Sequence, residues 1–510
     1  MADGTPPGYV IGLDIGTTST IAALVALPAK IAATASRPVT LSAPRTGWAE
    51  EDPEEWWRNS CAVLGEVMAA LPEGAALHGI CVTGMLPAIV LLDADGQILR
   101  PSIQQSDGRC GAEVRELAAE VAEEAFLART GNGINQQLAA AKLRWIAAHE
   151  PDVFARVATV FGSYDFINLR LTGLRGVERN WALEAGFVDL ADHRIAADLV
   201  ALSGLPVEAV PPLHASHDVI GAVTASAAEA TGLPEGLTVF GGAADHIASA
   251  LAAGLTAPGD VLLKFGGAGD IIVISDSVRA DPRMFLDYHL VPDLYAPNGC
   301  MAATGSALNW FSALLVPDAG DEKPHRRLDR LAGEIPPGSD GVLCLPYFLG
   351  EKTPIHDPLA RGTFTGLSFN HGTGHLWRAL LEAVAYAFRH HLEVLDEIGH
   401  RPVRLFASDG GSASRVWMQI MADVAGRPVQ VLGNDHGSCA GAAWVAAVAS
   451  GAADWDEIGA LVTYGETFSP KPGAVRSYDA RYAAFRALYV ALKPIFYAGE
   501  TAAGPTDQPF

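Results

Sequence analysis

The chain has 510 residues, enough for about two to four domains with large buried cores. Hydrophobic residues make up 49% and charged residues 18%, which is ordinary for a globular enzyme and excludes a disordered chain. The net charge of −23 leaves no basic stripe for phosphates, so nucleic acid is disfavoured as a partner. ATP is not excluded, because a few local donors and a metal ion are enough to bind it.

The six cysteines are scattered, and no two of them form a C-x-x-C pair. This excludes a zinc knuckle and a dense disulfide framework, and it favours a reducing compartment. The N-terminus lacks the basic and apolar regions of a signal peptide, and no apolar run approaches the ~20 residues of a membrane helix. We therefore expect a soluble, cytoplasmic protein with no membrane partner.

The first half opens with two short apolar runs, 10–14 and 21–25, which predict a hairpin around a turn of small residues. Asp52 and Pro53 are typical of a helix start, with an N-cap aspartate and proline at the first position. The buried face of that helix is predicted to contain Trp57, Cys61, Leu64, Met68 and Leu71. Further predicted elements are strands at 80–82 and 89–92 and helices over 111–171.

A second cycle of the same pattern begins near residue 255. The strand 261–265, a glycine turn and the strand 270–274 look like a diverged repeat of the opening hairpin. Alternating strands and helices predict α/β layers, with a domain boundary between 251 and 260. Later predicted elements are a helix over 376–392, a strand ending at Ser408, a glycine turn at 409–411 and a helix over 438–449.

The turn after Asp14 could bind phosphate and metal. Gly16 permits close approach of the backbone, and Thr17, Thr18 and the turn amides can donate to phosphate oxygens. Asp14 could hold a Mg²⁺ that bridges phosphates. A plain hairpin turn with a solvated aspartate is the alternative. A P-loop is excluded, because the chain has no Gly-Lys dipeptide.

Two further glycine turns could approach a nucleotide. Gly266 and Gly267 occupy the matching place in the second half, so two turns could clamp a triphosphate. The turn of Gly410, Gly411 and Ser412 suits a flat base or a ribose. For this last turn, a tight strand–helix connection is the alternative.

Asp245 follows a predicted strand and a glycine pair, close to the predicted domain boundary. An aspartate placed between two domains can accept the proton of a hydroxyl group that attacks the γ-phosphate. The alternative is a cap on the following helix, and both roles can coexist.

Two polar segments could recognise a polyol. Residues 104–109 place donors and acceptors close together, including Asp107 and Arg109, and a solvated loop is the alternative. Met85 follows the end of a strand where a ligand could lie, and core packing is the alternative for it.

Three longer motifs carry a family resemblance. Residues 362–367 read GTFTGL, and after seven residues come His375-Leu376 and then ALLE at 379–382. Residues 347–354 read YFLGEKTP, and KLRW stands at 142–145. With these motifs, residues 9–495 resemble the FGGY carbohydrate kinases, and the YFLGEKTP segment looks most like their xylulose kinase branch.

The resemblance implies an α/β fold of two actin-like (ribonuclease H-like) ATPase domains with an interdomain cleft. Residues 1–253 would bind sugar, 254–500 would bind nucleotide, and 501–510 would be a flexible tail. By position, Asp245 would be the catalytic base, and Asp14 and Asp245 would hold Mg²⁺. The remaining implied ligands are Thr17, Thr18, Gly266 and Gly267 for the ATP phosphates, Gly410, Gly411 and Ser412 for adenosine, and Met85, Asp107, Arg109, Asp245 and His246 for the sugar.

The implied activity is transfer of the ATP γ-phosphate to a ketose or polyol, with D-xylulose as the best match. Ribulose, erythrulose, glycerol and a non-enzymatic actin-like ATPase module are the alternatives, and a homodimer is compatible with the resemblance. His246 stands where the branch usually has asparagine, and Leu86 where it has histidine. The second phosphate turn lacks the usual Thr-Ser, and Asn180-Trp181 replaces small polar residues. These departures leave phosphoryl transfer untouched and concern the choice of sugar.

Overall fold

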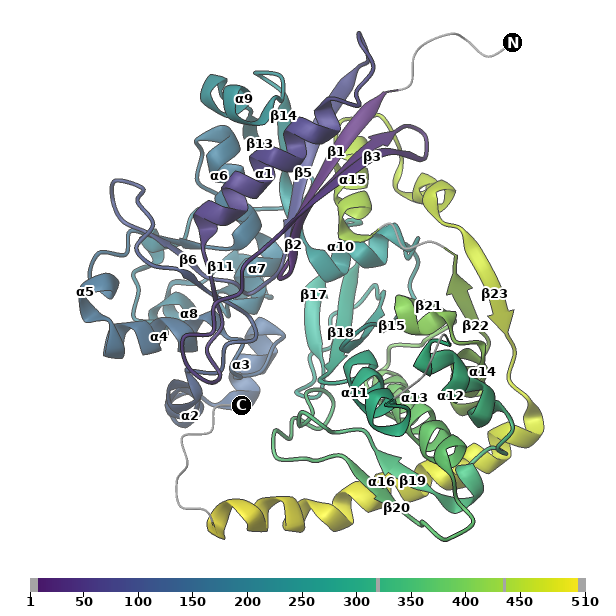
Figure 1. Cartoon of the computed structure of the whole chain (residues 1–510). Coiled ribbons are helices and arrows are strands. Elements are labelled where there is room, and N and C mark those ends of the chain that lie inside the picture. The colour runs from purple at the N-terminus through teal and green to yellow at the C-terminus, as the bar shows by residue number, and fades with distance from the viewer. Residues whose placement is uncertain (1–7, 318–321, 434–436, 503–510) are drawn as a thin grey trace, which may run out of the picture.

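The computed structural model describes residues 8–317, 322–433 and 437–502. Two mixed β-sheets form the centres of the two halves, and helices pack against each of them (Figure 1). No helix in these ranges is long and apolar enough to cross a membrane. The last helix, α16 (Pro472–Ala502), continues two residues into the predicted tail, whose remaining residues 503–510 lie outside the described ranges.

The first half is built on a six-stranded sheet in the order β13-β14-β5-β1-β2-β3. Its strands are β1 (Tyr9–Ile15), β2 (Ser19–Ala26), β3 (Lys30–Pro38), β5 (Leu77–Gly84), β13 (Val219–Ala222) and β14 (Thr238–Ala244). β1 and β2 form the predicted antiparallel hairpin, and β1, β5 and β14 run parallel.

Three parallel strands of this sheet end at one edge. The end of β1 lies beside Gly84 of β5, and Gly84 lies beside Ala244 of β14. Parallel strands point their carboxyl ends to the same edge, and ligands of open α/β sheets bind there. Asp14, Met85 and Asp245 are therefore brought to one edge although the sequence separates them widely.

The second half repeats this arrangement. Its seven-stranded sheet has the order β17-β18-β16-β15-β21-β22-β23. The strands are β15 (Asp260–Phe265), β16 (Gly269–Val273), β17 (Phe285–Tyr288), β18 (Tyr295–Met301), β21 (Arg404–Ser408), β22 (Val429–Leu432) and β23 (Tyr464–Phe468). The β15–β16 hairpin runs antiparallel, and β21 and β22 follow β15 in parallel, as β5 and β14 follow β1. The actin-like α/β fold and its internal repeat are confirmed.

Two helices, α10 (Asp245–Ala252) and α15 (Gly437–Ala449), pack together between the sheets. A Cβ on Gly441 of α15 would fall 1.9 Å from the Ala248 carbonyl oxygen of α10. A Cβ on Gly12 of β1 would fall 1.9 Å from the Cys439 carbonyl oxygen of α15. Helix α15 therefore lies on the sheet of the first half, although its sequence follows the boundary predicted at residue 254.

The first helix, α1 (Pro53–Met68), begins as predicted, with Asp52 accepting the Glu54 N–H as N-cap. Of the predicted buried face, Leu64 is buried, whereas Trp57, Cys61, Met68 and Leu71 are only partly buried. The buried side chains of α1 are Pro53, Trp56, Ser60, Val63, Leu64 and Val67. Trp56 rather than Trp57 points inward, because its indole N–H donates to the Glu51 carboxylate at 2.8 Å.

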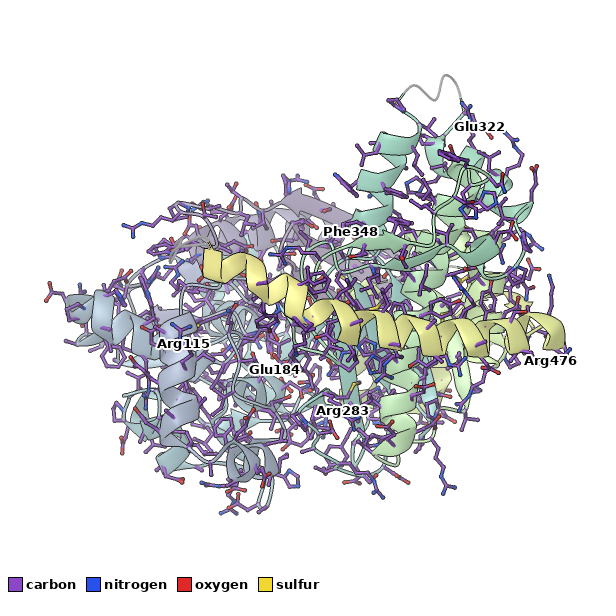
Figure 2. All side chains as sticks on the ribbon, turned by 90° about the horizontal axis from the view of Figure 1, so that it is seen from below. Arg115, Glu184, Arg283, Glu322, Phe348 and Arg476 are labelled. Atoms are coloured by element: carbon purple, nitrogen blue, oxygen red, sulfur yellow. The ribbon has the colours of Figure 1, made fainter. Side chains whose placement is uncertain are left out.

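The remaining helices surround the two sheets. In the first half they are α2 (Gly111–Glu120), α3 (Glu123–Thr130), α4 (Ala139–His149), α5 (Pro151–Phe154), α6 (Ser163–Thr172), α7 (Arg179–Glu184), α8 (Ala197–Ala201) and α9 (Ala225–Thr231). In the second half they are α11 (Gly305–Leu315), α12 (Pro324–Gly333), α13 (Thr373–Glu397) and α14 (Arg415–Ala425). Figure 2, viewed from below, shows α16 lying across the molecule. Its Tyr478 and Phe485 pack on Tyr386 of α13.

Short two-stranded ladders complete the fold. They are formed by β4 (Glu50–Glu51) with β7 (Ser102–Ile103), β6 (Val90–Leu92) with β8 (Thr159–Phe161), β9 (Val177–Glu178) with β12 (Leu213–His214), β10 (Val188–Asp189) with β11 (Arg194–Ile195), and β19 (Leu343–Leu345) with β20 (Thr363–Thr365).

Candidate active site

A cavity of about 420 Å³ lies where the two halves meet. Asp14, Thr17 and Met85 of the first half line it, together with Asp245 and His246 at the start of α10. Five of the residues selected from the sequence thus share one cavity. Further polar lining comes from Gln105, Gln137, Glu184, Lys264, Asp270, Asn298, Lys352 and Ser438.

The Asp14 carboxylate is buried at the end of β1, with 8% of the residue exposed. Its Oδ2 accepts a hydrogen bond of 2.6 Å from Ser438 Oγ, while its Oδ1 is buried without a hydrogen-bond partner. Burial and the nearby Asp245 carboxylate raise the pKa of Asp14, and the Ser438 hydroxyl opposes this rise. An orphaned carboxylate oxygen facing a second carboxylate fits a divalent cation.

Asp245 is the first residue of α10, and the N-cap position belongs to Ala244. It stands one place inside the N-cap position, and its side chain still accepts a backbone N–H of the first helical turn, as the capping alternative expected. Its Oδ1 accepts the His246 backbone N–H at 2.6 Å and lies 3.4 Å from His246 Nδ1. The side chain remains 35% exposed, so it is accessible from the cavity.

His246 sits between two carboxylates. Its Nε2 lies 2.9 Å from Asp287 Oδ2, on the opposite side of the ring from Asp245. Burial alone would lower the pKa of His246, but its hydrogen bonds to Asp245 and Asp287 outweigh burial and raise the pKa well above the usual value. The two carboxylates therefore favour the protonated, imidazolium form of the ring.

Glu184 completes this cluster. Its carboxyl group, His246 and Asp287 bring ligand atoms within 4.8 Å of one another. Burial and the Asp287 carboxylate raise the pKa of Glu184. A proton on Glu184 and the charge on His246 relieve the repulsion in the cluster without a metal ion. Sequence reasoning missed Glu184 and Asp287, because neither belongs to a motif that was selected from the sequence.

Two lysines face the carboxylates across the cavity. Lys264 of β15 and Lys352 are the lysines among the described residues that line it, and no arginine does. Lys352 lies between two anchored neighbours. Glu351 Oε1 accepts the backbone N–H groups of Ala302 and Lys352 at 2.7 and 2.9 Å, and Thr353 Oγ1 accepts the Cys300 N–H at 2.7 Å. Lys352 belongs to the YFLGEKTP motif, so its position could have been found from the sequence.

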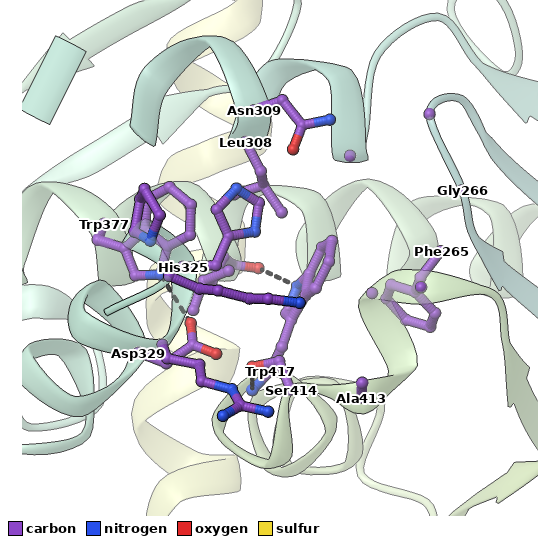
Figure 3. Close-up of a pocket in the computed structure, with 18 residues that line it drawn as sticks. Phe265, Gly266, Leu308, Asn309, His325, Asp329, Trp377, Ala413, Ser414 and Trp417 are labelled. Atoms are coloured by element: carbon purple, nitrogen blue, oxygen red, sulfur yellow. Dashed lines mark hydrogen bonds between the residues drawn. The ribbon is translucent and has the colours of Figure 1, made fainter. Parts of the chain in front are cut away.

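A second cavity of about 680 Å³ lies in the other half (Figure 3). Gly266, Gly267, Gly410 and Gly411 all border it, so the second and third glycine turns meet there. Ala268 borders the first cavity, so this turn lies between the two. The aromatic and polar side chains of the lining are Phe265, Asn309, Lys323, His325, Arg326, Asp329, Trp377, Ser414 and Trp417.

Four of the selected residues border neither cavity, and two of them, Thr18 and Ser412, belong to glycine turns. Thr18 is exposed in the first turn. Ser412 donates its hydroxyl hydrogen to the Asp409 carbonyl at 2.7 Å, within the turn itself. Their proposed contacts with ATP remain predictions.

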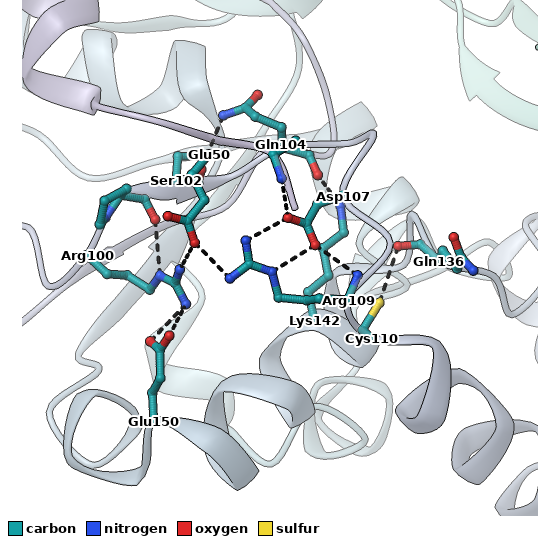
Figure 4. Close-up of polar contacts among 12 residues, drawn as sticks. Glu50, Arg100, Ser102, Gln104, Asp107, Arg109, Cys110, Gln136, Lys142 and Glu150 are labelled. Carbon is teal, nitrogen blue, oxygen red and sulfur yellow. Dashed lines mark hydrogen bonds and ion pairs between the residues drawn. The ribbon is translucent and has the colours of Figure 1, made fainter. Parts of the chain in front are cut away.

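Asp107 and Arg109 also lie outside the cavity lining, in a buried ion-pair network (Figure 4). Arg109 Nε and Nη2 donate to the two oxygens of Asp107 at 2.8 and 2.6 Å, and Nη1 contacts Glu50 at 2.7 Å. The guanidinium stacks 3.7 Å above the Trp48 ring. Both side chains hold the loop in place, and Gln105 of the same loop reaches the cavity. A sugar contact by Asp107 and Arg109 remains a prediction.

Two repeated sheets that face a shared cleft with glycine turns define an actin-like phosphotransferase fold. Comparison with family models assigns both halves. Residues 9–252 match the N-terminal domain and residues 271–450 the C-terminal domain of the FGGY family of carbohydrate kinases. The chain therefore belongs to the FGGY family, whose members use ATP to phosphorylate an alcohol group.

Individual relatives extend this assignment. The crystal structure of a xylulose kinase from Rhodospirillum rubrum is 66% identical, covers 96% of this chain and all of its own (100%), and superposes with a TM-score of 0.92. A xylulose kinase of Bacillus subtilis is 28% identical over 495 residues, which are 96% of this chain and 98% of the relative. A gluconokinase of the same species is 26% identical over 474 residues, which are 91% of this chain and 92% of the relative.

Proposed function

We propose that this enzyme transfers the γ-phosphate of MgATP to a primary hydroxyl group of D-xylulose. The observation that carries the proposal is the meeting of Asp14 and Asp245 in one cavity, opposite Lys264 and Lys352. Phosphoryl transfer depends on positioning and on charge stabilisation, and these four residues supply charges of both signs.

Each carboxylate has a separate role in the proposal. Asp245 accepts the proton of the attacking hydroxyl group, a contribution of roughly 10²–10⁴ in rate. Asp14 and Asp245 would hold Mg²⁺, which offsets the charge of the phosphates when bound. Lys264 and Lys352 stabilise the charge on the transferred group from the other side of the cleft.

The nucleotide would occupy the larger cavity. Its aromatic side chains and the backbone at Gly410 and Gly411 suit a purine and a ribose, and Gly266 and Gly267 would approach the phosphates. The turn of residues 266–269 borders both cavities, so a triphosphate that follows it would carry its γ-phosphate toward Asp245. Thr17 and Thr18 would contact the same phosphates from the first half.

We place the sugar at the end of the smaller cavity that lies beside His246, and the charge at this sugar end favours a neutral substrate. Asp245 and Asp287 bring two carboxylates to this end, beside the protonated Glu184 carboxyl group and against one imidazolium. A sugar acid such as gluconate would place a further carboxylate here, and such like-charge contacts cost several kcal/mol. The 66% identity with a xylulose kinase makes D-xylulose the best candidate among neutral sugars.

Measurement of ADP release in a coupled assay tests the proposal. We expect kcat/KM for D-xylulose to exceed that for D-ribulose, erythrulose and glycerol, and to exceed that for gluconate by at least ~100-fold. A preference for gluconate would overturn the charge argument. Asp245→Asn should abolish turnover and leave ATP binding nearly intact, and unchanged turnover would remove Asp245 as the base. ATP hydrolysis that no sugar stimulates would instead support a non-enzymatic actin-like module.

The assembly and location of the enzyme are also proposals. A homodimer is compatible with the family resemblance, and the six free cysteines support a cytoplasmic location. Light scattering of the purified protein and fractionation of the source cells would test them.

A further inference from the structure

The edge strand β17 of the second sheet is fastened to the first half of the chain by two asparagine side chains. Asn132 Nδ2 donates to the Leu286 carbonyl at 3.0 Å, and its Oδ1 accepts the Leu286 N–H at 2.9 Å. Asn180 of α7 makes the same two bonds with Tyr288, at 3.1 and 2.7 Å. Both asparagines are buried, so each amide replaces the hydrogen bonds that a neighbouring strand would supply.

Asp287 lies between the two fastened residues. It is fully buried, and its Oδ2 accepts hydrogen bonds from His246 and Asn298, both at 2.9 Å. Side chains alternate along a strand, so a slip of β17 by one residue would turn Asp287 away from His246. The two amides fix the register that keeps Asp287 in contact with His246.

His246 connects Asp287 to Asp245. Its Nδ1 and its backbone N–H both lie near Asp245 Oδ1, at 3.4 and 2.6 Å. The Glu184 carboxyl group lies beside His246 and Asp287, and Glu184 follows Asn180 by four residues on the same helix, where side chains share a face. Helix α7 therefore both fastens β17 and adds a carboxyl group next to Asp287.

We propose that Asp287 is a positioning residue for phosphoryl transfer, acting through His246 on Asp245, and that Asn132 and Asn180 hold β17 in the register this requires. The inference rests on the proposed role of Asp245 as the base. With Asp287 in place the imidazole ring is held at both nitrogens, and it holds the Asp245 carboxylate in a single orientation. Without Asp287 one nitrogen loses its partner, and the ring and Asp245 gain freedom that a near-attack geometry cannot tolerate.

A double-mutant cycle on kcat tests the connection. Asp287→Asn should lower kcat by roughly 10- to 100-fold and change KM for ATP and sugar by less than about 3-fold. His246→Asn should give a similar loss. If Asp287 acts only through His246, the double variant should be at most about 3-fold slower than His246→Asn alone. The inference would be overturned if the kcat losses of the two single variants multiply in the double variant. A change in KM for the sugar with kcat preserved would also overturn it.

Variants of the asparagine side chains test the inference even if the Asp287→Asn protein fails to fold. Asn180→Ala should reproduce the kcat loss in weaker form, and Asn59→Ala should not, although the Asn59 amide also bonds to a strand carbonyl, that of Pro38. Asp260→Asn removes a buried carboxylate elsewhere in the same sheet and should leave kcat within about 2-fold. Full activity of Asn180→Ala would overturn the role of the amides.

Asp245→Asn, measured in the same series, separates this inference from the proposed function. If Asp245→Asn is inactive while Asp287→Asn and Asn180→Ala are unaffected, only the inference fails. If Asp245→Asn keeps its turnover, the proposed function fails first.

Discussion

Ser438 Oγ donates a hydrogen bond of 2.6 Å to Asp14 Oδ2, across 424 positions of sequence. The contact exists because α15, the helix of Ser438, packs on β1 rather than on the sheet of its own half. The hydroxyl lowers the pKa of Asp14, against burial and the Asp245 carboxylate, which raise it. It therefore favours the ionised form, which a cation requires.

Ser438→Ala should weaken MgATP use. Without the hydroxyl the pKa of Asp14 rises further, so a larger fraction is protonated at any given pH. A hydrogen bond to a charged group contributes about 1.5–3 kcal/mol. Its loss predicts at least a tenfold fall in kcat/KM for MgATP. The defect should be larger at pH 6 than at pH 8. Ser438→Thr, which keeps the hydroxyl, should retain most of the activity, and a pH-independent defect would contradict the explanation.

Gly441→Ala should destabilise the contact between α10 and α15. The added Cβ would fall 1.9 Å from the Ala248 carbonyl oxygen, and backbone cannot move aside cheaply. Overpacking of this kind costs about 3 kcal/mol, so we expect a melting temperature lower by roughly 5–10 °C. Gly473→Ala is the control, since an added Cβ there meets nothing within 4 Å. Its melting temperature should stay the same or rise slightly.

Gly410→Val should obstruct the nucleotide without harming the fold. Gly410 borders the larger cavity, and an added Cβ meets nothing within 4 Å, so the side chain would occupy ligand space. Steric changes of this size in a pocket alter binding by about 1–3 kcal/mol, so KM for ATP should rise at least tenfold. Gly459→Val, also free of contacts and outside this cavity, should leave KM unchanged. An unaltered KM in Gly410→Val would place the nucleotide elsewhere.

Lys352→Met should lower kcat more than it raises KM for either substrate. The proposed interaction strengthens as charge develops on the transferred phosphoryl group, so its loss appears in the chemical step. We expect a loss of roughly 100-fold in single-turnover rate. Lys352→Arg should recover part of it, and Lys30→Met, at an exposed position of β3, controls for loss of a lysine charge. Unchanged kcat would remove Lys352 from the reaction.

Glu351→Gln should change how stability depends on pH. Burial raises the pKa of Glu351 to about 8, against the two backbone N–H donors and Lys352, from 4.5 in the unfolded chain. The folded state therefore holds a proton that the unfolded state releases. Stability falls as pH rises from 4.5 to about 8, by at most about 1.4 kcal/mol per unit.

Glutamine keeps the acceptor for both N–H groups and removes the titration. The melting temperature of the variant should therefore exceed that of the native enzyme by a margin that grows from pH 5 to pH 8. A constant margin over this range would show that Glu351 does not titrate on unfolding.

Local patterns were sufficient for much of the fold and of the site. Each of three predicted features depends only on neighbouring residues and forms as predicted. They are the hairpin around the turn after Asp14, its repeat near Gly266 and the glycine turn at Gly410. Because parallel strands end at a common edge, strand-end residues such as Met85 and Asp245 could also be placed near Asp14.

Other features depended on which distant surfaces pack together. The buried face of α1 matches the prediction at Leu64 but differs at Trp56, because the Trp56 indole donates to a buried carboxylate, and helix periodicity alone does not show this contact. Asp107 and Arg109 satisfy each other in the core, since burying two charges is tolerable only when they are paired.

The sequence by itself determined the repeated α/β units, the strand-end carboxylates and the family to which the enzyme belongs. Only the tertiary structure decided that α15 crosses to the first sheet, where Ser438 meets Asp14. Only the tertiary structure also shows that Asn132 and Asn180 form hydrogen bonds with β17, which places Asp287 in contact with His246. The reason is physical. Strand and turn preferences act over a few residues, whereas hydrogen bonds between buried groups form wherever packing brings the two partners together.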